Sequence, residues 1–273
     1  MRIASLHVYP VKGARGITLQ HAEMLASGLD HDRRFMVLDA KGIFVTQREH
    51  PRMALVNVAL EPDRMMLGVA GKTASVPLLP DPRSLPRRRV RIWDDEVDVC
   101  VVEGEGAELF SAHLGERCSL VYMPPDVVRP VEAPYGAPGD RVGLADAYPV
   151  LVASLASLAD LNARLVATGS PAVPMDRFRP NIVVEGGEPY AEEQTPAARI
   201  GSLRLRMPKR CARCQVTTVD QTTAETSKEP LRTLASYRTV HRKVMFAMNA
   251  IPDLAPDDSA MISVGDAVEY ERP

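Results

Sequence analysis

The chain has 273 residues, of which 45% are hydrophobic and 25% are charged, proportions of a soluble globular protein that exclude disordered and fibrous classes. Lysine and arginine (33) nearly balance aspartate and glutamate (35), leaving a formal net charge of −2, so no overall basic field indicates a nucleic-acid partner. No apolar run reaches the roughly 18 residues of a membrane-spanning helix, and the opening MRIASLHVYPVKG has the pattern of neither a signal peptide nor a presequence, so we expect a cytoplasmic protein with no membrane partner.

The cysteines and histidines do not form a recognisable framework. Cys100, Cys118, Cys211 and Cys214 are too few and too dispersed for a set of disulfides in a chain of this length, and they fit a reducing compartment. The six histidines are scattered without metal-ligand spacing, and we interpret them as structural or surface residues.

Residues 1–125 are predicted to form a β-rich domain of hairpins. Two apolar runs flank a turn at residues 39–42, and further pairs of runs lie within residues 54–71 and 90–104. Residues 107–115 predict a short helix that a glycine ends.

The densest basic run is RRRVR at residues 87–91. Acidic residues follow it closely, at Asp94, Asp95 and Glu96, and no aromatic residues are interleaved. This pattern indicates a solvated edge strand rather than a nucleic-acid site.

Residues 121–142 are dense in proline and glycine without a period, which places a domain boundary near residue 125. We therefore predict two domains, residues 1–125 and 126–273.

The second domain opens with the strongest helix signal in the chain, with Ser154 as N-cap and Gly169 after its end. Its apolar face is formed by four leucines: Leu155, Leu158, Leu161 and Leu165. The remaining predicted elements are strands within residues 181–186, 199–208 and 214–220 and a weaker helix within residues 229–238, where Pro230 suits the first turn.

The sharpest local feature is the C-x-x-C pair of Cys211 and Cys214. A structural zinc site would need two more ligands at suitable spacing, and a thioredoxin-like motif would open a helix, whereas a strand is predicted here. Three neighbouring cations, Lys209, Arg210 and Arg213, favour a thiolate that binds soft metals or attacks electrophiles. A pair of ordinary half-buried cysteines is equally compatible with the segment alone.

Cations also gather beside glycine or proline in two loops. Lys12 and Arg15 lie in a loop near the first predicted strand, and Arg177, Arg179 and Asn181 directly precede another strand. Together with the Arg33-Arg34 pair, these residues would form a phosphate or dianion site, because arginine binds such oxygens in a bidentate manner and lysine as a point charge.

Eight segments in order resemble MOSC-domain proteins: YPVKG, DRRFMVLD, FVTQREHPRM, ASLADLN, FRPNIVVEGGEPYAEE, CARCQVTTVD, KEPLRTLASYR and VGDAVEY. The resemblance covers essentially the whole chain and is to the subgroup with an N-terminal β-barrel domain, which includes the mitochondrial amidoxime reducing component and its bacterial relatives. It implies a mainly β, α+β fold, an N-terminal MOSC β-barrel-like domain followed by a MOSC β-barrel domain, and a molybdenum–molybdopterin cofactor in the cleft between them.

The resemblance also implies roles for individual residues. Cys214 matches the cysteine that ligates molybdenum and is catalytic, and Cys211 is not expected to be a ligand. Asp146 is a second catalytic candidate, at the open face of the metal. The residues implied to contact the cofactor are Lys12, Gly13, Arg34, Tyr148, Arg179, Asn181, Ala212 and Arg213. Relatives often carry serine at the positions of Gly13 and Ala212, so only backbone contacts are carried over there.

The activity implied by the resemblance is molybdenum-dependent reduction of N-hydroxylated compounds such as amidoximes, hydroxylamines and N-hydroxylated base analogues. The membrane anchor of eukaryotic relatives and the ferredoxin-like tail of some bacterial ones are not seen in the sequence. Electrons are therefore expected from a separate donor, a ferredoxin- or cytochrome-type protein with its reductase. The alternative is a non-catalytic carrier in which Cys214 holds a persulfide or the chain transfers the cofactor.

Overall fold

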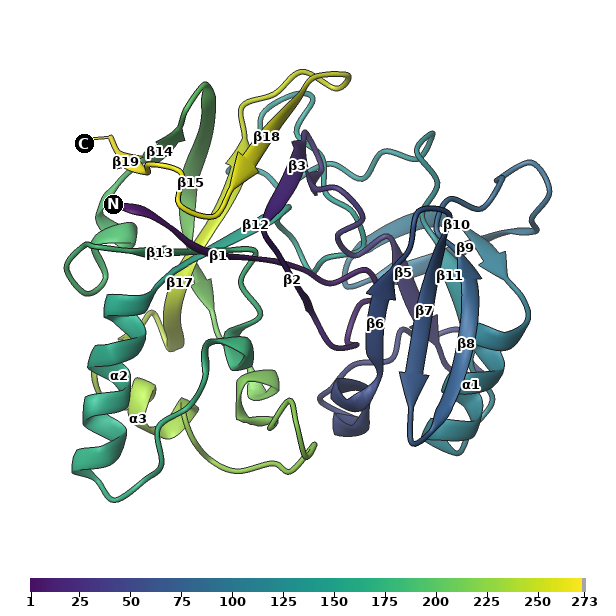
Figure 1. Cartoon of the computed structure of the whole chain (residues 1–273), viewed down its shortest axis with the longest axis horizontal. Helices are drawn as coiled ribbons and strands as arrows, with labels where there is room; N and C mark the ends of the chain where they lie inside the picture. Colours follow the sequence, from purple (N-terminus) through teal and green to yellow (C-terminus); the bar gives the residue numbers. More distant parts are fainter. Residues whose placement is uncertain (272–273) are drawn as a thin grey trace.

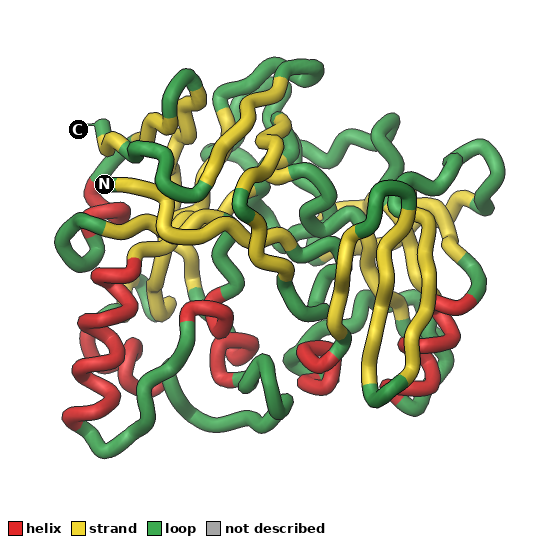
Figure 2. The backbone as a smooth tube through the Cα atoms, viewed as in Figure 1, coloured by secondary structure: helices red, strands yellow, loops and turns green. Residues whose placement is uncertain are grey.

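The computed structural model describes residues 1–271 and folds them into two lobes that lie side by side (Figure 1). Strands dominate both lobes, and the helices are few and short (Figure 2), which confirms the mainly β, α+β class. Within these residues, no helix is both long enough and apolar enough to cross a membrane.

The strands are β1 (Arg2–Val8), β2 (Ile17–Leu19), β3 (His21–Leu25), β4 (Gly28–Leu29), β5 (Phe35–Leu38), β6 (Asn57–Leu60), β7 (Arg64–Val69), β8 (Lys72–Pro77), β9 (Arg87–Ile92), β10 (Asp95–Val102), β11 (Ser119–Tyr122), β12 (Val150–Ser154), β13 (Ile182–Glu185), β14 (Ala197–Ile200), β15 (Leu203–Ala212), β16 (Thr239–Val240), β17 (Lys243–Pro252), β18 (Ser259–Ser263) and β19 (Glu269–Tyr270). The α-helices are α1 (Glu105–Leu114), α2 (Leu155–Ala167) and α3 (Leu231–Tyr237), and the 3-10 helices are η1 (Pro51–Leu55), η2 (Met175–Phe178), η3 (Ala191–Gln194) and η4 (Gln215–Thr218).

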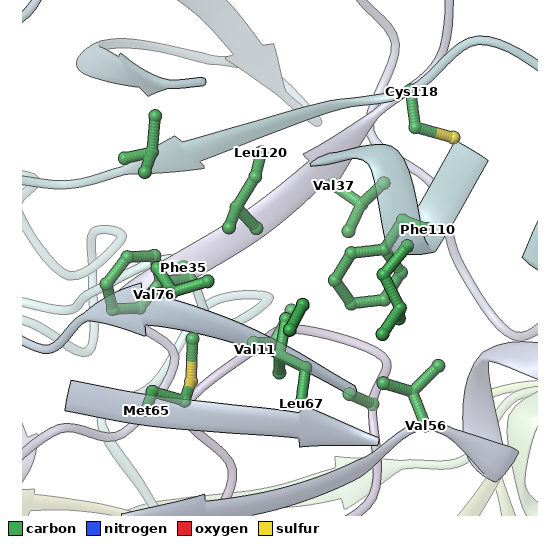
Figure 3. Close-up of a cluster of buried hydrophobic side chains, with 14 of the residues drawn as sticks. Val11, Phe35, Val37, Val56, Met65, Leu67, Val76, Phe110, Cys118 and Leu120 are labelled. Carbon is green, nitrogen blue, oxygen red and sulfur yellow. The ribbon is translucent and has the colours of Figure 1, made fainter. Parts of the chain in front are cut away.

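The first lobe packs two antiparallel sheets and α1 around one core. One sheet has the order β6-β7-β8 and the other β5-β11-β10-β9. In β7, Met65 and Leu67 are buried while Arg64 is exposed, because alternate side chains of a strand point to opposite faces. These methionine and leucine side chains meet Phe35 of β5 and Phe110 of α1 in the core (Figure 3). The predicted hairpins β6–β7 and β9–β10 are confirmed, as is the short helix, which ends at Gly115 in the left-handed conformation.

The basic run at residues 87–91 forms β9, the edge strand of its sheet, as predicted. Arg89 pairs with Asp98 and Arg91 with Glu96 on the neighbouring strand. These exposed pairs are screened by solvent, and their charges oppose edge-to-edge association.

The second lobe is built on one nine-stranded sheet with the order β19-β14-β15-β17-β12-β13-β1-β2, to which β16 adds beside β17. The parallel pair β12 and β13 is joined through α2. Ser154 caps this helix as predicted, since its Oγ accepts a hydrogen bond from the Ala156 N–H at 3.1 Å. Leu161 and Leu165 are fully buried, whereas Leu155, in the first turn, is 38% exposed and does not join the predicted apolar face. The second predicted helix is α3, which directly follows Pro230.

The first four strands of the chain pair within the second lobe. β1 runs antiparallel to β13, and β3 pairs with β18 near the end of the chain. Between β1 and β2 the chain visits the first lobe, where Val11 bridges to Phe35 and packs in its core. The division at residue 125 stays a prediction about where the domains are joined, because β1 to β4 pair within the sheets of the second lobe.

Two predicted strands are wrong in detail. Residues 199–208 are not one strand but a hairpin of β14 and β15, with Gly201 in the turn at a φ of +57°. Residues 214–220 form η4 rather than a strand. There the Thr217 and Thr218 hydroxyls donate to carbonyls three residues earlier, at 3.0 and 2.7 Å, which favours a tight turn over an extended chain.

Candidate functional site

A cavity of about 180 Å³ is lined by residues of both lobes. One side of the cavity is lined by Lys12 and Gly13 of the loop after β1, by residues 45–48 of the first lobe, and by residues 145–148 of the loop before β12. The other side is lined by residues around the ends of η2 and β15, including Arg179 and Cys214. Residues far apart in the sequence therefore share one cleft.

Lys12 and Asp146 form an ion pair inside this cleft. Lys12 Nζ lies 2.5 Å from Asp146 Oδ1 and also donates to the Leu144 carbonyl at 2.9 Å. Burial lowers the pKa of Lys12, although Asp146 partly offsets this effect. The surrounding protein by itself would raise the pKa of Asp146, but the Lys12 charge and hydrogen bonds from Lys12 and Trp93 outweigh it, so the pKa of this carboxyl lies below its usual value. The Asp146 carboxyl is therefore ionised at neutral pH.

Arg129 fixes the loop that carries Asp146. Its buried guanidinium donates to the carbonyls of Gly143, Ala145 and Asp146, at 3.1, 2.5 and 2.8 Å, and its Nε donates to Asp95 at 2.7 Å. Arg129 is not among the residues predicted from the sequence. In the sequence, Arg129 is a single charged residue within the proline-rich segment of residues 121–142, and no local pattern there indicates that it binds three backbone carbonyls.

Arg179 and Arg33 lie close together beside Tyr9. The carbon at the centre of each guanidinium lies 4.2 Å from the Tyr9 ring centroid. Arg179 Nη1 donates to the Ala14 carbonyl at 2.7 Å, which ties η2 to the loop after β1. Burial lowers the pKa of Arg179 to about 10, so the guanidinium remains charged at neutral pH.

Asn181 is buried behind these arginines and is used internally. Its Oδ1 accepts from the Leu151 N–H and from Arg33 Nη1, both at 3.1 Å, and its Nδ2 donates to the His7 carbonyl at 3.2 Å. Asn181 therefore lines the cavity as a residue that positions Arg33.

Three of the predicted anion-site cations do not line the cavity. Arg15 donates to the Gln221 carbonyl, and Arg177 donates to the Thr218 carbonyl at 3.0 Å and pairs with Asp220 at 2.7 Å. The third is Arg34. Its guanidinium donates to the Met123 carbonyl and lies over the Tyr122 ring, so it packs against β11. Arg33 lines the cavity instead, with a φ of +46° that turns the chain just before β5. Consecutive residues near a strand point to opposite sides, so only one of the two arginines reaches the cleft.

The two cysteines have different environments. Cys214 is exposed at the start of η4, whereas Cys211 is half-buried and its Sγ lies 2.9 Å from Arg213 Nη1. Burial raises the pKa of the Cys211 thiol, and the Arg213 charge only partly opposes this. Arg213 also donates to the Phe178 carbonyl at 2.8 Å, while its buried Nε has no hydrogen-bond partner among the described residues. Ala212, at the end of β15, is exposed and lines the cavity.

Tyr148 and Gly13, which were both predicted to contact a cofactor, also line the cavity. The Tyr148 hydroxyl donates to Glu132 at 3.0 Å, so only the ring side of this residue is available to a ligand. Gly13 has a φ of +88°, a conformation that favours glycine.

Two glutamines join the lobes beside the cavity and were missed by the sequence analysis. Gln47 Nε2 donates to the Gly13 carbonyl at 2.7 Å, and the Gln47 and Gln221 amides hydrogen-bond to each other at 2.9 and 3.1 Å. Gln47 lies in the segment FVTQREHPRM, which was recognised as a family segment without a residue being assigned from it. The neighbouring Thr46 and Arg48 line the cavity too.

The cavity is strongly positive although the whole chain is slightly acidic. Among its lining residues in the described chain, Asp146 is the only acidic one, against five cations: Lys12, Arg33, Arg48, Arg179 and Arg213. Arg33 is also paired with the buried Asp32 just outside the lining, at 2.5 Å, which leaves an excess of three positive charges. Beside an exposed thiol, this excess suits an anion that also carries a thiophilic group.

Comparisons with known proteins agree with this architecture. The MOSC N-terminal beta barrel domain matches residues 1–117, and the MOSC domain matches residues 139–269. Mitochondrial amidoxime-reducing component 1 of Mus musculus is 34% identical, over 97% of this chain and 81% of that protein. The Homo sapiens protein of the same name is 36% identical, over 86% of this chain and 72% of that protein. Molybdenum cofactor sulfurase of Arabidopsis thaliana is 28% identical, over 97% of this chain but 35% of that protein.

The two lobes and the positive cleft between them thus define a MOSC protein with an N-terminal beta barrel domain, and the chain belongs to the family that contains the mitochondrial amidoxime-reducing components. At the level of this family, an oxidoreductase-type role is supported.

Proposed function

We propose that this protein is a molybdenum-cofactor-dependent oxidoreductase that reduces N-hydroxylated compounds with electrons from a separate donor protein. The observation that carries the proposal is the cleft itself, where five cations, one held carboxylate and one exposed thiol converge from both lobes. The names of the relatives, amidoxime-reducing component and molybdenum cofactor sulfurase, point in the same direction.

The residues present fit such a cofactor. Its phosphate needs cations, and the Nε atom of Arg213 is buried without a partner among the described residues, as expected for a donor kept for a bound anion. Lys12, Arg33, Arg179 and Arg213 would hold the phosphate and pterin, and Cys214 would supply the soft anionic ligand. When bound, the cofactor supplies two-electron redox chemistry at its metal.

The chain's own contribution to catalysis centres on Asp146. Reduction of an amidoxime to an amidine breaks the N–O bond, consumes two electrons and two protons, and releases water. Because the pKa of Asp146 is lowered, its carboxylate is ionised at neutral pH and accepts hydrogen bonds from the N–H and O–H groups of such a substrate. Lys12 holds a proton 2.5 Å away and keeps the carboxylate in place.

The electrons are proposed to come from a ferredoxin- or cytochrome-type donor with its reductase. Cys100 and Cys118 are buried in the first lobe, away from the cleft. Among residues 1–271, no group of three or more histidine, cysteine or acidic side chains could hold a metal ion. The isolated protein with NADH alone is therefore expected to be inactive on amidoximes but active with reduced viologen.

The test uses protein purified from a host that makes the cofactor. We expect stoichiometric molybdenum and viologen-driven reduction of benzamidoxime. Cys214→Ser should abolish the activity, since a serine oxygen is a harder and more basic ligand, whereas the matched Cys211→Ser should retain most of it. Equal behaviour of the two variants would refute the ligand assignment. Metal-free protein with a persulfide on Cys214, an exposed thiol, would instead support the carrier function.

A further inference from the structure

The only tryptophan of the chain, Trp93, occupies an unfavourable backbone position at the edge of the cleft. It lies in the two-residue turn between β9 and β10, where Ile92 pairs with Asp95. Its φ is +55°, in the left-handed region, where such turns favour glycine and where a bulky residue is strained. Strain of this kind persists where the surroundings impose it, and it is frequent at functional sites.

Two contacts connect this turn to the loop that carries Asp146. Trp93 Nε1 donates to Asp146 Oδ1 at 3.3 Å, and Asp95 binds Arg129, whose guanidinium holds three carbonyls of residues 143–146. The tip of a first-lobe hairpin is thereby fixed against the loop before β12. The position of the indole is consequently set by the same contacts that set the carboxylate.

Trp93 is part of an aromatic and cationic group. The Arg48 guanidinium lies 4.8 Å from the indole centroid, and the Phe44 ring packs edge-on against it at 5.4 Å and 74°. Phe44 also lies 5.4 Å from Lys12 Nζ. Arg48 and Asp146, both in contact with Trp93, line the cavity, whereas Trp93 itself does not, which places the indole at the rim.

Trp93 is 47% exposed despite these contacts. They cover only part of the residue, so a large part of its surface stays open at the rim of the cleft. A large π surface held at the mouth of a polar cleft is suited to stack against a planar group of a bound molecule.

We infer that Trp93 forms a substrate-recognition subsite that stacks on the planar, π-bonded part of N-hydroxylated substrates while their N–O group lies in the cleft. The inference rests on the proposed function for the identity of the substrates. The subsite favours aromatic amidoximes and N-hydroxylated bases over small aliphatic analogues that carry the same reacting group. Trp93 is thus a specificity-determining residue.

The kinetic test compares benzamidoxime with acetamidoxime in wild type, Trp93→Phe and Trp93→Gly. Stacking of one aromatic pair corresponds to a preference of about threefold to tenfold. We expect Trp93→Gly to lower kcat/KM for benzamidoxime by about that factor, mainly through KM, with a much smaller change for acetamidoxime. Trp93→Phe should keep most of the preference, because it retains an aromatic face and loses only the N–H donor. If both variants change the two substrates alike, Trp93 acts only through Asp146 and the inference is overturned.

Stability and fluorescence provide readouts that do not depend on turnover. Trp93→Gly removes the strained residue from the turn, so it should fold and melt close to the wild type, and a kinetic loss cannot then be attributed to unfolding. Leu79→Ala, at an exposed apolar residue of the first lobe that does not line the cavity, is the control and should keep the wild-type preference.

Because Trp93 is the only tryptophan, its emission reports directly on this site. Benzamidoxime should quench the emission in a saturable manner, and acetamidoxime at the same concentrations should not. An inactive wild type would contradict the proposed function, and the quenching experiment would then decide the subsite alone. Absence of saturable quenching by benzamidoxime would overturn the inference.

Discussion

At the scale of single residues, several cleft side chains serve both the fold and the site. Arg179 hydrogen-bonds the Ala14 carbonyl through Nη1, while its Nε and Nη2 make no hydrogen bond within residues 1–271. Asn181 shows the opposite balance, because both ends of its amide are used internally. The free donors of Arg179 make it the better candidate for an anion ligand.

Arg179→Ala should lower the molybdopterin content of the purified protein while changing the stability of the cofactor-free protein only slightly. The apoprotein loses the hydrogen bonds of Nη1 to the Ala14 carbonyl at 2.7 Å and to Gln221 Oε1 at 3.5 Å, of which the first contributes about 1 kcal/mol and the long second one less. Arg179→Lys should restore binding only in part, since the bidentate geometry is lost. Cofactor analysis together with urea unfolding of the apoprotein measures both quantities. A loss of several kcal/mol in the apoprotein would make Arg179 a structural residue.

A buried carboxyl far from this chemistry predicts a pH dependence of stability. Glu192 is fully buried; its Oε1 accepts from the Ser157 hydroxyl at 2.7 Å, and its Oε2 has no partner among the described residues. Burial raises the pKa of Glu192 to about 7. The folded chain therefore binds a proton that the unfolded chain has released. This contribution to stability is complete below the unfolded pKa and is lost as the pH rises through about 7.

Glu192→Gln should remove this dependence, because a neutral amide keeps the acceptor for Ser157 and does not ionise. At pH 8 the free energy of unfolding of the variant should exceed that of the wild type by up to about 3 kcal/mol, so the variant unfolds at a higher urea concentration. At pH 5 the two proteins should unfold at similar urea concentrations. Unfolding curves at the two pH values provide the measurement. If wild type and variant differ in free energy of unfolding by the same amount at both pH values, the raised pKa of Glu192 is contradicted.

At the scale of elements, the helix α2 could be predicted from local sequence signals, whereas the position of the β9–β10 turn could not. The helix follows from leucine spacing and a serine cap, which are local signals, and the structure contains both. The turn lacks the usual glycine, since its residues are Trp93 and Asp94, so its position beside Asp146 follows only from contacts between lobes.

Ser154→Ala should destabilise the protein by about 1 kcal/mol, because the Ala156 N–H loses its capping acceptor. Ser170, just past the helix, makes no side-chain hydrogen bond in the described structure, so Ser170→Ala serves as the control and should stay within about 0.5 kcal/mol. Thermal or urea unfolding distinguishes the two. Indistinguishable variants would show that the cap contributes nothing to stability.

At the scale of the whole molecule, the two lobes depend on each other through the first 29 residues. β1 completes the sheet of the second lobe beside β13, and β3 pairs with β18. Removing them would leave β13 and β18 with exposed edges.

A fragment of residues 126–273 should therefore be insoluble or unfolded when expressed alone. Co-expression of residues 1–125 should rescue it, since the missing strands add to the open edges. Solubility and circular dichroism of each piece, and co-purification of the pair, test this. A well-folded, monomeric 126–273 fragment would show that the cut at residue 125 separates independent domains.

The sequence was sufficient for the fold class, most hairpins, the three α-helices and those cavity residues that the family resemblance implied, because these depend on periodicity, caps and that resemblance. It did not show which of the adjacent residues Arg33 and Arg34 faces the cavity, because this depends on the positive φ of Arg33. It also failed for contacts over long separations, such as Gln47 with Gln221, since a neutral amide carries no local signal for a partner 174 residues away.

The pairing of β1 with β13 also has a consequence for biosynthesis. Arg2 can bind Glu185 only after the ribosome has synthesised 183 further residues. At roughly 5–20 residues per second, this synthesis takes about 10 to 40 s. During that interval the nascent N-terminal strand can pair only on the side of the short strand β2, while the hairpins of the first lobe can already close. Cys214 is translated later still, so the cleft cannot be complete, and cannot take up a cofactor, before synthesis has passed residue 214.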